Sequence, residues 1–259
     1  MQLKILGTGS AGNCYILENN KEALIIELGL SFSKIKQALN FDLSKVVGAL
    51  VTHEHGDHVG KNKEGLLGAL NNGIEVYSGQ GTFDVLNIKN HNCRNFKKGG
   101  YTEIGSFKVL PFKAIHCNND GSECAEPINF IIEHDECGCV LFVTDSLYCG
   151  PRFTDYSIKF NNIIIEANYC EEIIKKNLEK GKLPVYLYNR ILKSHMSLNT
   201  CKETLLANDL SQVQKIVLIH LSDSNSDEKK FKEVITNATG KIVHVANNNQ
   251  TIEFNKNPF

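Results

Sequence analysis

The residues best suited to chemistry are four potential metal ligands within a run of six positions. Residues 51–58 read Val-Thr-His-Glu-His-Gly-Asp-His, and the four ligands are His53, His55, Asp57 and His58. Imidazole nitrogens and carboxylate oxygens are natural ligands of zinc and related divalent ions. Because side chains alternate along an extended chain, His53 and His55 point the same way, and a turn at Gly56 directs the other two elsewhere. The run predicts a metal site with ligands for two neighbouring ions.

Three further candidate ligands each follow an apolar run that we expect to form a strand. These ligands are His116 after residues 107–112, Asp145 after residues 139–143, and His220 after residues 216–219. Loops at one edge of a sheet can converge, so these residues can join the first cluster. A solvated polar loop and a closed structural zinc site are the alternatives, but structural sites usually have four ligands, often cysteines. The extra ligands favour an open catalytic centre.

The rest of the pattern is that of one α/β domain spanning residues 1–259, with strands and helices mixed throughout. Short apolar runs separated by turn-rich stretches predict the strands. Helical spacing of apolar residues predicts helices at 33–39, 64–70, 171–179, 198–207 and 227–235. We expect the last helix to be capped by Ser226 and to end near Gly240.

Composition limits the classes of partner. The formal net charge is −1, whereas proteins that bind long nucleic acids usually have strongly basic surfaces, so such a partner is disfavoured. No run of 18 apolar residues predicts a membrane span, and a glycine comes too early for a secretory signal, so we expect a cytoplasmic protein without membrane contact. The nine cysteines include Cys137 and Cys139, which are spaced too closely for a usual zinc motif, and we interpret all nine as thiols.

In order and spacing, the candidate ligands resemble the metallo-β-lactamase superfamily, whose H-x-H-x-D-H signature is matched in full. The resemblance spans nearly the whole chain and implies an αββα sandwich, in which two mixed β-sheets are flanked by helices. It implies two divalent metal ions, one held by His53, His55 and His116, the other by Asp57, His58 and His220, with Asp145 bridging them. Zn²⁺ suits these ligands, and manganese (Mn²⁺), iron and cobalt are alternatives. Two adjacent ions suit phosphodiester cleavage.

Three other segments resemble the ribonuclease Z and YycJ/WalJ branch of that superfamily. They are a glycine-rich stretch at 6–15, the segment 163–167 around Glu166 and the segment 194–197 around His195. The branch implies that His195 protonates the leaving oxygen, that Glu166 is its carboxylate partner, and that Asp57 helps to orient the attacking hydroxide. The sequence departs from the superfamily at Glu27, where an aspartate usually supports the metal-binding histidines.

Segments 194–198, 206–210 and 219–227 look like the phage-type anti-Pycsar phosphodiesterases. This likeness implies a homodimer that hydrolyses cyclic nucleotide monophosphates to linear nucleotides, so a small nucleotide is the leading substrate. A YycJ-like nuclease that acts on DNA or RNA is the alternative enzyme, with thioester hydrolysis third. A protein that sequesters a cyclic nucleotide without cleaving it is the alternative outside catalysis. The stretch between His116 and Pro127, which holds three acidic residues, is interpreted as a solvated loop.

Overall fold

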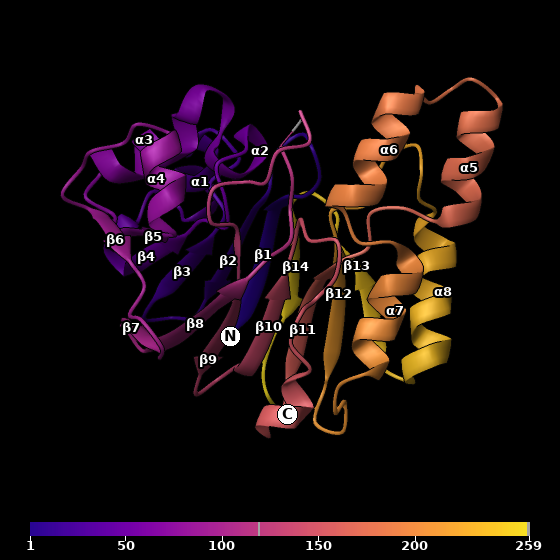
Figure 1. The fold of residues 1–259 in the computed structure, drawn as a ribbon. Coiled ribbons are helices and arrows are strands. Elements are labelled where there is room, and N and C mark those ends of the chain that lie inside the picture. The colour runs from indigo at the N-terminus through magenta and orange to yellow at the C-terminus, as the bar shows by residue number, and fades with distance from the viewer. Residues whose placement is uncertain (119, 258–259) are drawn as a thin grey trace.

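The apolar runs of the sequence form two seven-stranded β-sheets in the computed structural model, which describes residues 1–118 and 120–257 (Figure 1). The first sheet has the strand order β14-β1-β2-β3-β4-β5-β6. Its strands are β1 (Gln2–Gly7), β2 (Cys14–Glu18), β3 (Ala23–Ile26), β4 (Val46–Leu50), β5 (Val76–Ser78), β6 (Cys93–Asn95) and β14 (Gln250–Glu253). Strands β3 to β6 run parallel to one another, whereas β14, β1 and β2 pair antiparallel, so the sheet is mixed.

The second sheet is also mixed and has the order β13-β12-β11-β10-β9-β8-β7. Its strands are β7 (Thr102–Ile104), β8 (Phe107–Lys113), β9 (Ile128–His134), β10 (Gly138–Val143), β11 (Asn162–Glu166), β12 (Lys215–Ile219) and β13 (Ile242–Val245). Strands β10 to β13 are parallel, and β7, β8 and β9 pair antiparallel. The carboxyl ends of β8, β10, β11 and β12 therefore lie at the same edge of this sheet.

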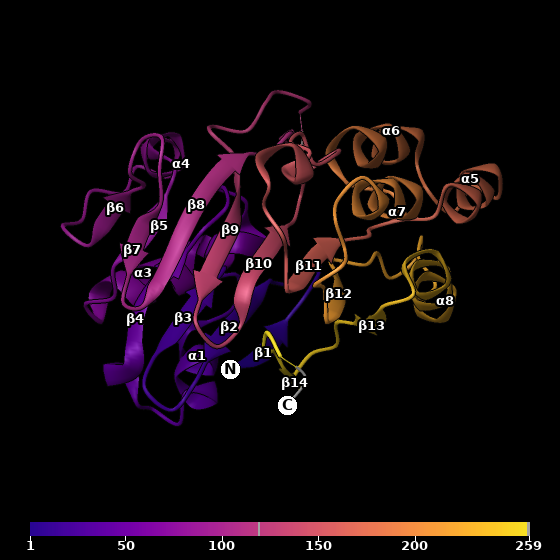
Figure 2. The same ribbon diagram turned by 90° about the horizontal axis from the view of Figure 1, so that it is seen from below.

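Helices cover the outer face of each sheet, as the two ribbon views show (Figures 1 and 2). On the first sheet they are α1 (Phe32–Ala38), α2 (Gly56–Val59), α3 (Glu64–Asn71) and α4 (Gln80–Val85). Beside the second sheet lie α5 (Glu171–Glu179), α6 (Val185–Ser194), α7 (Leu198–Leu206) and α8 (Glu228–Thr239). Short 3₁₀ turns at Leu43–Lys45, Lys61–Lys63 and Phe153–Tyr156 complete the elements.

The buried side chains divide into layers that match this arrangement. One core lies between the sheets and includes Tyr15, Phe130 and Phe142. A second lies between the first sheet and its helices, and a third between the second sheet and α7 and α8. This layering confirms the αββα sandwich, a metallo-β-lactamase fold, which the sequence predicted. Burial of apolar area of this kind is the main favourable term in folding.

Some local predictions need correction. The sequence did not predict α6, whose exposed face carries the apolar side chains of Val185 and Tyr186 and so obscures the helical pattern. Helix α8 is capped by Asp227, which accepts a hydrogen bond from the Lys230 amide, and not by Ser226. It ends at Gly240, as predicted, with a left-handed backbone.

The structure also bears on the predictions about the cysteines and about membrane spans. All nine cysteines are free thiols. Within residues 1–118 and 120–257, the helices are too short and too polar to cross a bilayer.

Three loops of the first sheet are joined through their backbones where the strands end. The Asn13 amide donates to the Asp57 carbonyl at 2.8 Å, and the Leu28 amide donates to the His58 carbonyl at 2.8 Å. Gly29 lies so close to this contact that a Cβ added to it would come within 1.8 Å of the Asp57 carbonyl oxygen. Only glycine permits such an approach of two backbones. The residue therefore fixes the position of the loop at 53–58.

We expect the substitution Gly29→Ala to destabilise the protein by about 3 kcal/mol or more, because overpacked backbone must move to admit the methyl group. Gly56→Ala is the matched control in the same loop, since a Cβ there meets no atom within 4 Å. Its effect should be under about 1 kcal/mol. Chemical unfolding of both variants measures the two free energies. Equal midpoints would show that the close approach is not a constraint.

Candidate metal centre

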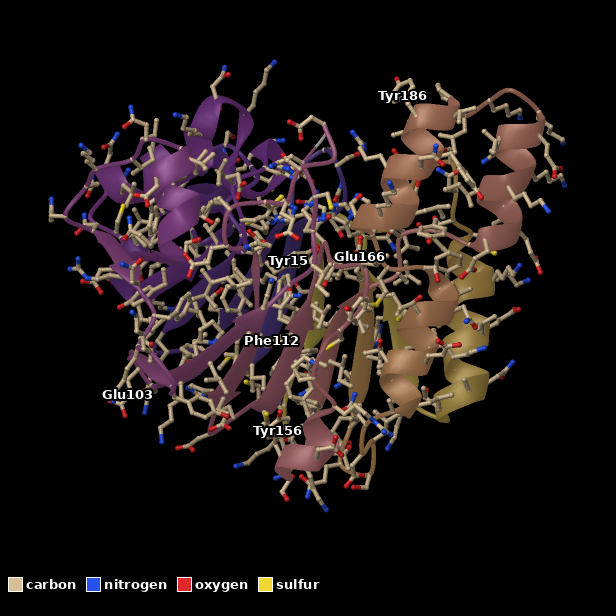
Figure 3. The ribbon with its side chains drawn as sticks, viewed as in Figure 1. Tyr15, Glu103, Phe112, Tyr156, Glu166 and Tyr186 are labelled. Carbon is tan, nitrogen blue, oxygen red and sulfur yellow. The ribbon has the colours of Figure 1, made fainter. Side chains whose placement is uncertain are left out.

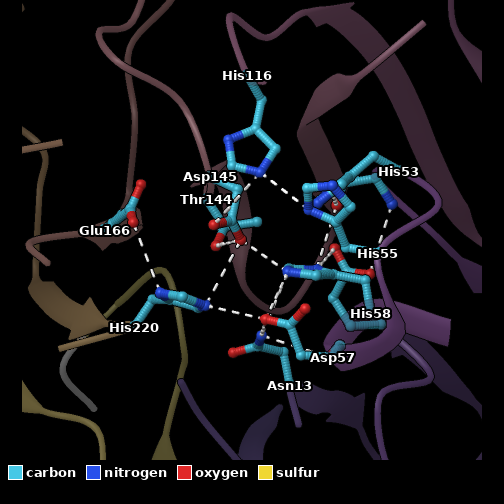
Figure 4. A network of polar contacts seen from close by, with 12 residues as sticks. Asn13, His53, His55, Asp57, His58, His116, Thr144, Asp145, Glu166 and His220 are labelled. Carbon is cyan, nitrogen blue, oxygen red and sulfur yellow. Dashed lines mark hydrogen bonds and ion pairs between the residues drawn. The ribbon is translucent and has the colours of Figure 1, made fainter. Parts of the chain in front are cut away.

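All seven predicted ligands lie at the carboxyl ends of strands, where the two sheets meet (Figure 4). The loop at 53–58 follows β4, and its last residues begin the short helix α2. His116 follows β8, Asp145 follows β10 and His220 follows β12. Asp145 and His220 have backbone φ angles of 44° and 56°, in the left-handed region that non-glycine residues rarely adopt. Such strained conformations are often found at functional sites.

The first group of ligand atoms comes from His53, His55 and His116, whose nitrogens lie within 4.8 Å of one another. His116 Nε2 lies 3.1 Å from His55 Nδ1. The third nitrogen, His53 Nε2, is buried and has no hydrogen-bond partner in the protein. Buried polar atoms are nearly always paired, so an unpaired imidazole nitrogen facing two others fits a bound metal ion.

The second group comes from Asp57, His58, Asp145 and His220, whose ligand atoms also lie within 4.8 Å of one another. Asp145 Oδ2 is 2.7 Å from His58 Nε2 and 3.6 Å from His220 Nε2. His220 Nε2 is 3.3 Å from Asp57 Oδ2. The other oxygen of Asp145 is 4.0 Å from His116 Nε2. Asp145 thus stands between the two groups, and together they are consistent with a dinuclear metal site.

The second nitrogen of each imidazole is held by a neighbouring group, which fixes the ring for metal binding. His53 Nδ1 lies 2.9 Å from Thr52 Oγ1, and His116 Nδ1 donates to the Ser194 carbonyl at 2.7 Å. Glu27, fully buried, has Oε1 at 3.3 Å from His58 Nδ1, so its longer side chain reaches the histidine. Glu27 Oε1 nevertheless makes no hydrogen bond, and the hydrogen-bond partner of His58 Nδ1 is Thr52 Oγ1 at 3.4 Å, so Glu27 supports His58 through charge alone.

Three asparagines that the sequence analysis did not single out also touch the ligands, and one of them, Asn168, has Nδ2 at 3.1 Å from His220 Nδ1. Asn13, at the end of the glycine-rich stretch, has Nδ2 at 3.3 Å from both Asp57 Oδ2 and His58 Nε2. Asn118 Oδ1 lies 3.1 Å from His55 Nε2. Asn13 lies in the glycine-rich stretch at 6–15, so its place near the site could have been predicted from the sequence. Asn118 is recognisable only once the fold brings its loop to the site.

The stretch between His116 and Pro127 is therefore only partly the solvated loop that the sequence predicted. Its acidic residues Asp120, Glu123 and Glu126 are exposed. Cys124, however, is buried, with Sγ 3.6 Å from His55 Nε2. Asn118 and Cys124 of this stretch cover one side of the first ligand group. The sequence analysis did not identify these contacts because neither residue is charged.

The electrostatics of the two ligand groups differ. Burial lowers the pKa of His53 well below its ordinary value and lowers that of His116 to about 3, so both imidazoles keep a lone pair free. Burial opposes the charged form of Asp145, but the imidazoles of His220 and His58 outweigh it and hold the pKa well below its ordinary value. Burial disfavours the charged forms of His58 and His220, but Asp57, Glu27 and Asp145 outweigh it at His58, and Asp145 and Asp57 do so at His220, so the pKa of each imidazole is raised. These two residues would therefore release a proton on binding a metal.

His195 and Glu166 form a pair beside the ligands. His195 Nδ1 lies 2.7 Å from Glu166 Oε1 and 3.0 Å from Asp145 Oδ1. Glu166 is fully buried at the end of β11, and its Oε2 accepts hydrogen bonds from the amides of Ser146 and Met196. Burial disfavours a charged His195, but Glu166 and Asp145 outweigh it and raise the pKa to about 10. The raised pKa favours the doubly protonated imidazole, the form that can give up a proton.

A cavity of about 190 Å³ opens onto both ligand groups and onto His195. Its wall also includes Ser10 and Arg190. A larger cavity of about 630 Å³ shares His116 and Cys117 with it and is lined by Phe112, Ala114 and Ile128 among others. The arrangement offers a polar site for a reacting group beside an apolar space of ligand size.

Comparison with known proteins agrees with this geometry. The family model of the metallo-beta-lactamase superfamily matches residues 7–78. The metallo-beta-lactamase fold protein YhfI from Bacillus subtilis superposes with a TM-score of 0.70 at 15% identity, over 97% of this chain and 99% of that one. The fold and the clustered His and Asp ligands define a metal-dependent hydrolase of the metallo-β-lactamase fold.

Among curated proteins, the chain is similar over most of its length to two bacterial exodeoxyribonucleases. It is 27% identical to WalJ of Streptococcus pneumoniae strain D39 over 234 residues, which cover 86% of this chain and 82% of WalJ. It is 27% identical to YycJ of Bacillus anthracis over 240 residues, 88% of this chain and 85% of YycJ. The anti-Pycsar protein Apyc1 of Bacillus phage 010DV004 is 39% identical, but over 71 residues, 25% of this chain and 28% of Apyc1.

We expect the substitution His53→Ala to remove one of two metal ions. A two-metal site should bind about two ions per chain, and His53 contributes only to the first group, so the variant should keep about one. Elemental analysis after loading with Zn²⁺ and desalting gives the stoichiometry. His91→Ala, at an exposed histidine, is the control and should keep both ions. Loss of both ions, or of neither, in the His53 variant would contradict two separate groups.

Proposed function

We propose that the protein is a phosphodiesterase that removes nucleotides from the ends of DNA. The observation that carries this proposal is the single cavity that joins two groups of metal ligands to the His195–Glu166 pair. Similarity over most of the chain to two exodeoxyribonucleases supports DNA as the substrate. The alternative derived from the sequence, a YycJ-like nuclease, thus takes precedence over the leading expectation of a cyclic nucleotide.

The residues of the cavity have distinct parts in this reaction. The two ligand groups would hold two divalent ions, Zn²⁺ by the choice of ligands, which would supply positive charge beside a phosphoryl group and make water a better nucleophile. Asp57, whose side chain is 22% exposed, orients the attacking water from the second ligand group. Glu166 holds His195 Nδ1, which leaves Nε2 as the nitrogen that gives a proton to the departing ribose oxygen.

Hydrolysis of cyclic nucleotide monophosphates is the second candidate. It has the support of the 39% identity to Apyc1 over 71 residues. The cavity of about 190 Å³ beside an apolar space of about 630 Å³ also suits a single nucleotide with its base. The same metal ligands and the same proton donor serve both substrates, so the chemistry of the centre does not choose between them.

A substrate panel separates the two candidates. The metal-loaded protein should release mononucleotides from linear single-stranded DNA and should leave circular single-stranded DNA intact, because attack begins at an end. Chromatography of the products, with 3′,5′-cyclic mononucleotides tested in parallel, gives the answer. Ring opening of cyclic mononucleotides without release from DNA would transfer the assignment to the second candidate.

The role of His195 has a test that depends on the leaving group. With DNA, His195→Ala should lower kcat by about 10²–10⁴-fold, because the ribose oxygen leaves poorly without a proton. With bis(p-nitrophenyl) phosphate the loss should be small, since p-nitrophenolate leaves unprotonated. Steady-state kinetics on both substrates measure the difference. Equal losses on both would assign His195 a structural role, and metal analysis of the variant would show whether ligand geometry was disturbed.

A further inference from the structure

Helix α6 carries a row of three side chains that leads toward the metal centre. Tyr186, Arg190 and Lys193 are spaced by four and three residues, so they lie on one face of the helix. Tyr186 is 75% exposed, and Lys193 is exposed as well. Arg190 is half-buried and lines the cavity that contains both ligand groups. The row therefore connects the outer surface to the reacting site.

This part of the chain is basic, although the whole protein is not. Residues 180–195 contain four Lys or Arg residues and no Asp or Glu, whereas the chain as a whole has a net charge of −1. Arg190 lines the cavity and Lys193 lies near the inner end of α6, whereas Lys180 and Lys182 precede the helix, so two of these four charges are placed to attract a phosphate group towards the cavity. Arginine in particular matches the geometry of a phosphate through its planar set of donors.

The position of α6 relative to the centre is firmly set. The carbonyl of its last residue, Ser194, accepts the hydrogen bond from His116 Nδ1 at 2.7 Å, and His195 follows directly. Its inner face packs through Ile191 against the apolar cluster with Ile174 of α5. Tyr186 lies at the outer end of the helix and Glu166 near its inner end (Figure 3). Helix geometry separates Tyr186 from His195 by about 13 Å along the axis.

We propose that the face formed by Tyr186, Arg190 and Lys193 binds the DNA strand whose terminal phosphodiester enters the cavity. This inference rests on the proposed function and specifies the substrate as a single strand. Tyr186 offers an aromatic surface on which an unpaired base stacks, and Arg190 and Lys193 contact the phosphates between that base and the site. A length of about 13 Å accommodates roughly four stacked nucleotides at about 3.4 Å each. A cyclic mononucleotide in the cavity is too short to reach Tyr186.

Binding without turnover tests the stacking contact. Metal-free protein in chelator is titrated against a fluorescently labelled single-stranded DNA of about ten nucleotides, and anisotropy gives Kd. Tyr186→Ala should weaken binding about fivefold or more, and Tyr186→Phe should restore it, because the ring and not the hydroxyl stacks. Tyr156→Ala is the matched control, since Tyr156 is 70% exposed and lies on a distant part of the molecule (Figure 3). Equal Kd values for the Tyr186 and Tyr156 alanine variants would overturn the proposal.

The dependence of Kd on salt tests the phosphate contacts. Each contact with a single strand contributes about 0.7 to the slope of log K against log salt concentration. Lys193→Ala should therefore lower the slope by about 0.7, and Lys232→Ala, at an exposed position on α8, should leave it unchanged. An unchanged slope in the Lys193 variant would remove this residue from the binding face.

Turnover of two substrates separates this inference from the proposed function. In the metal-loaded protein, Tyr186→Ala should raise KM for single-stranded DNA about fivefold or more and should leave hydrolysis of bis(p-nitrophenyl) phosphate unchanged. If the wild type degrades DNA and Tyr186→Ala does so with the same KM, the binding face is wrong and the nuclease stands. If the wild type binds DNA through Tyr186 but cleaves none, the face stands and the nuclease is wrong.

Discussion

The site depends on the buried carboxylate of Asp145. Imidazoles from both halves of the sandwich surround it. One of its oxygens lies 2.7 Å from His58 Nε2, beyond the first sheet, and the other lies 3.0 Å from His195 Nδ1, beside the second. A buried anion is costly unless it is paired and hydrogen-bonded. The loops that carry these imidazoles therefore cannot separate without leaving the charge unpaired. Asp145 has a strained backbone with a φ of 44°. The strand ends that converge on the site must hold this residue in place.

The clustering of the seven candidate metal ligands was predictable because each follows an apolar strand, and parallel strands bring their carboxyl ends to one edge. The supporting contacts were less predictable. Glu27 was identified as a departure, but only the structure shows that its carboxylate reaches His58. Asn118 contacts His55 from a loop more than sixty residues along the chain, and no local pattern marks such a pairing. Helix α6 escaped prediction because Val185 and Tyr186 place apolar side chains on its exposed face.

Charge illustrates how a whole-chain property can mislead about a local surface. A net charge of −1 argued against a nucleic-acid substrate, and for a partner that covers the whole protein this reasoning holds. The end of a DNA strand that enters one cavity contacts only the side chains around that cavity. Of the four basic residues between 180 and 195, Arg190 lines this cavity and Lys193 is exposed on the same face of α6. The proposed approach to the site along this face of α6 is therefore basic, although the protein as a whole has almost no net charge.

The location of the basic row on α6 follows from the way the rest of the centre is built. The loops of the first sheet are committed to one another through backbone contacts at Asn13, Gly29 and Asp57, and have little freedom to adapt to a substrate. Helix α6 instead ends at Ser194, whose carbonyl orients His116, and passes directly into His195. A DNA strand held along α6, as proposed, would thus be bound to the element that positions both a candidate metal ligand and the proposed proton donor. Because a misplacement of about 1 Å can cost a large part of the rate, this direct connection would keep the proposed substrate, the candidate ligand and the proposed proton donor in register.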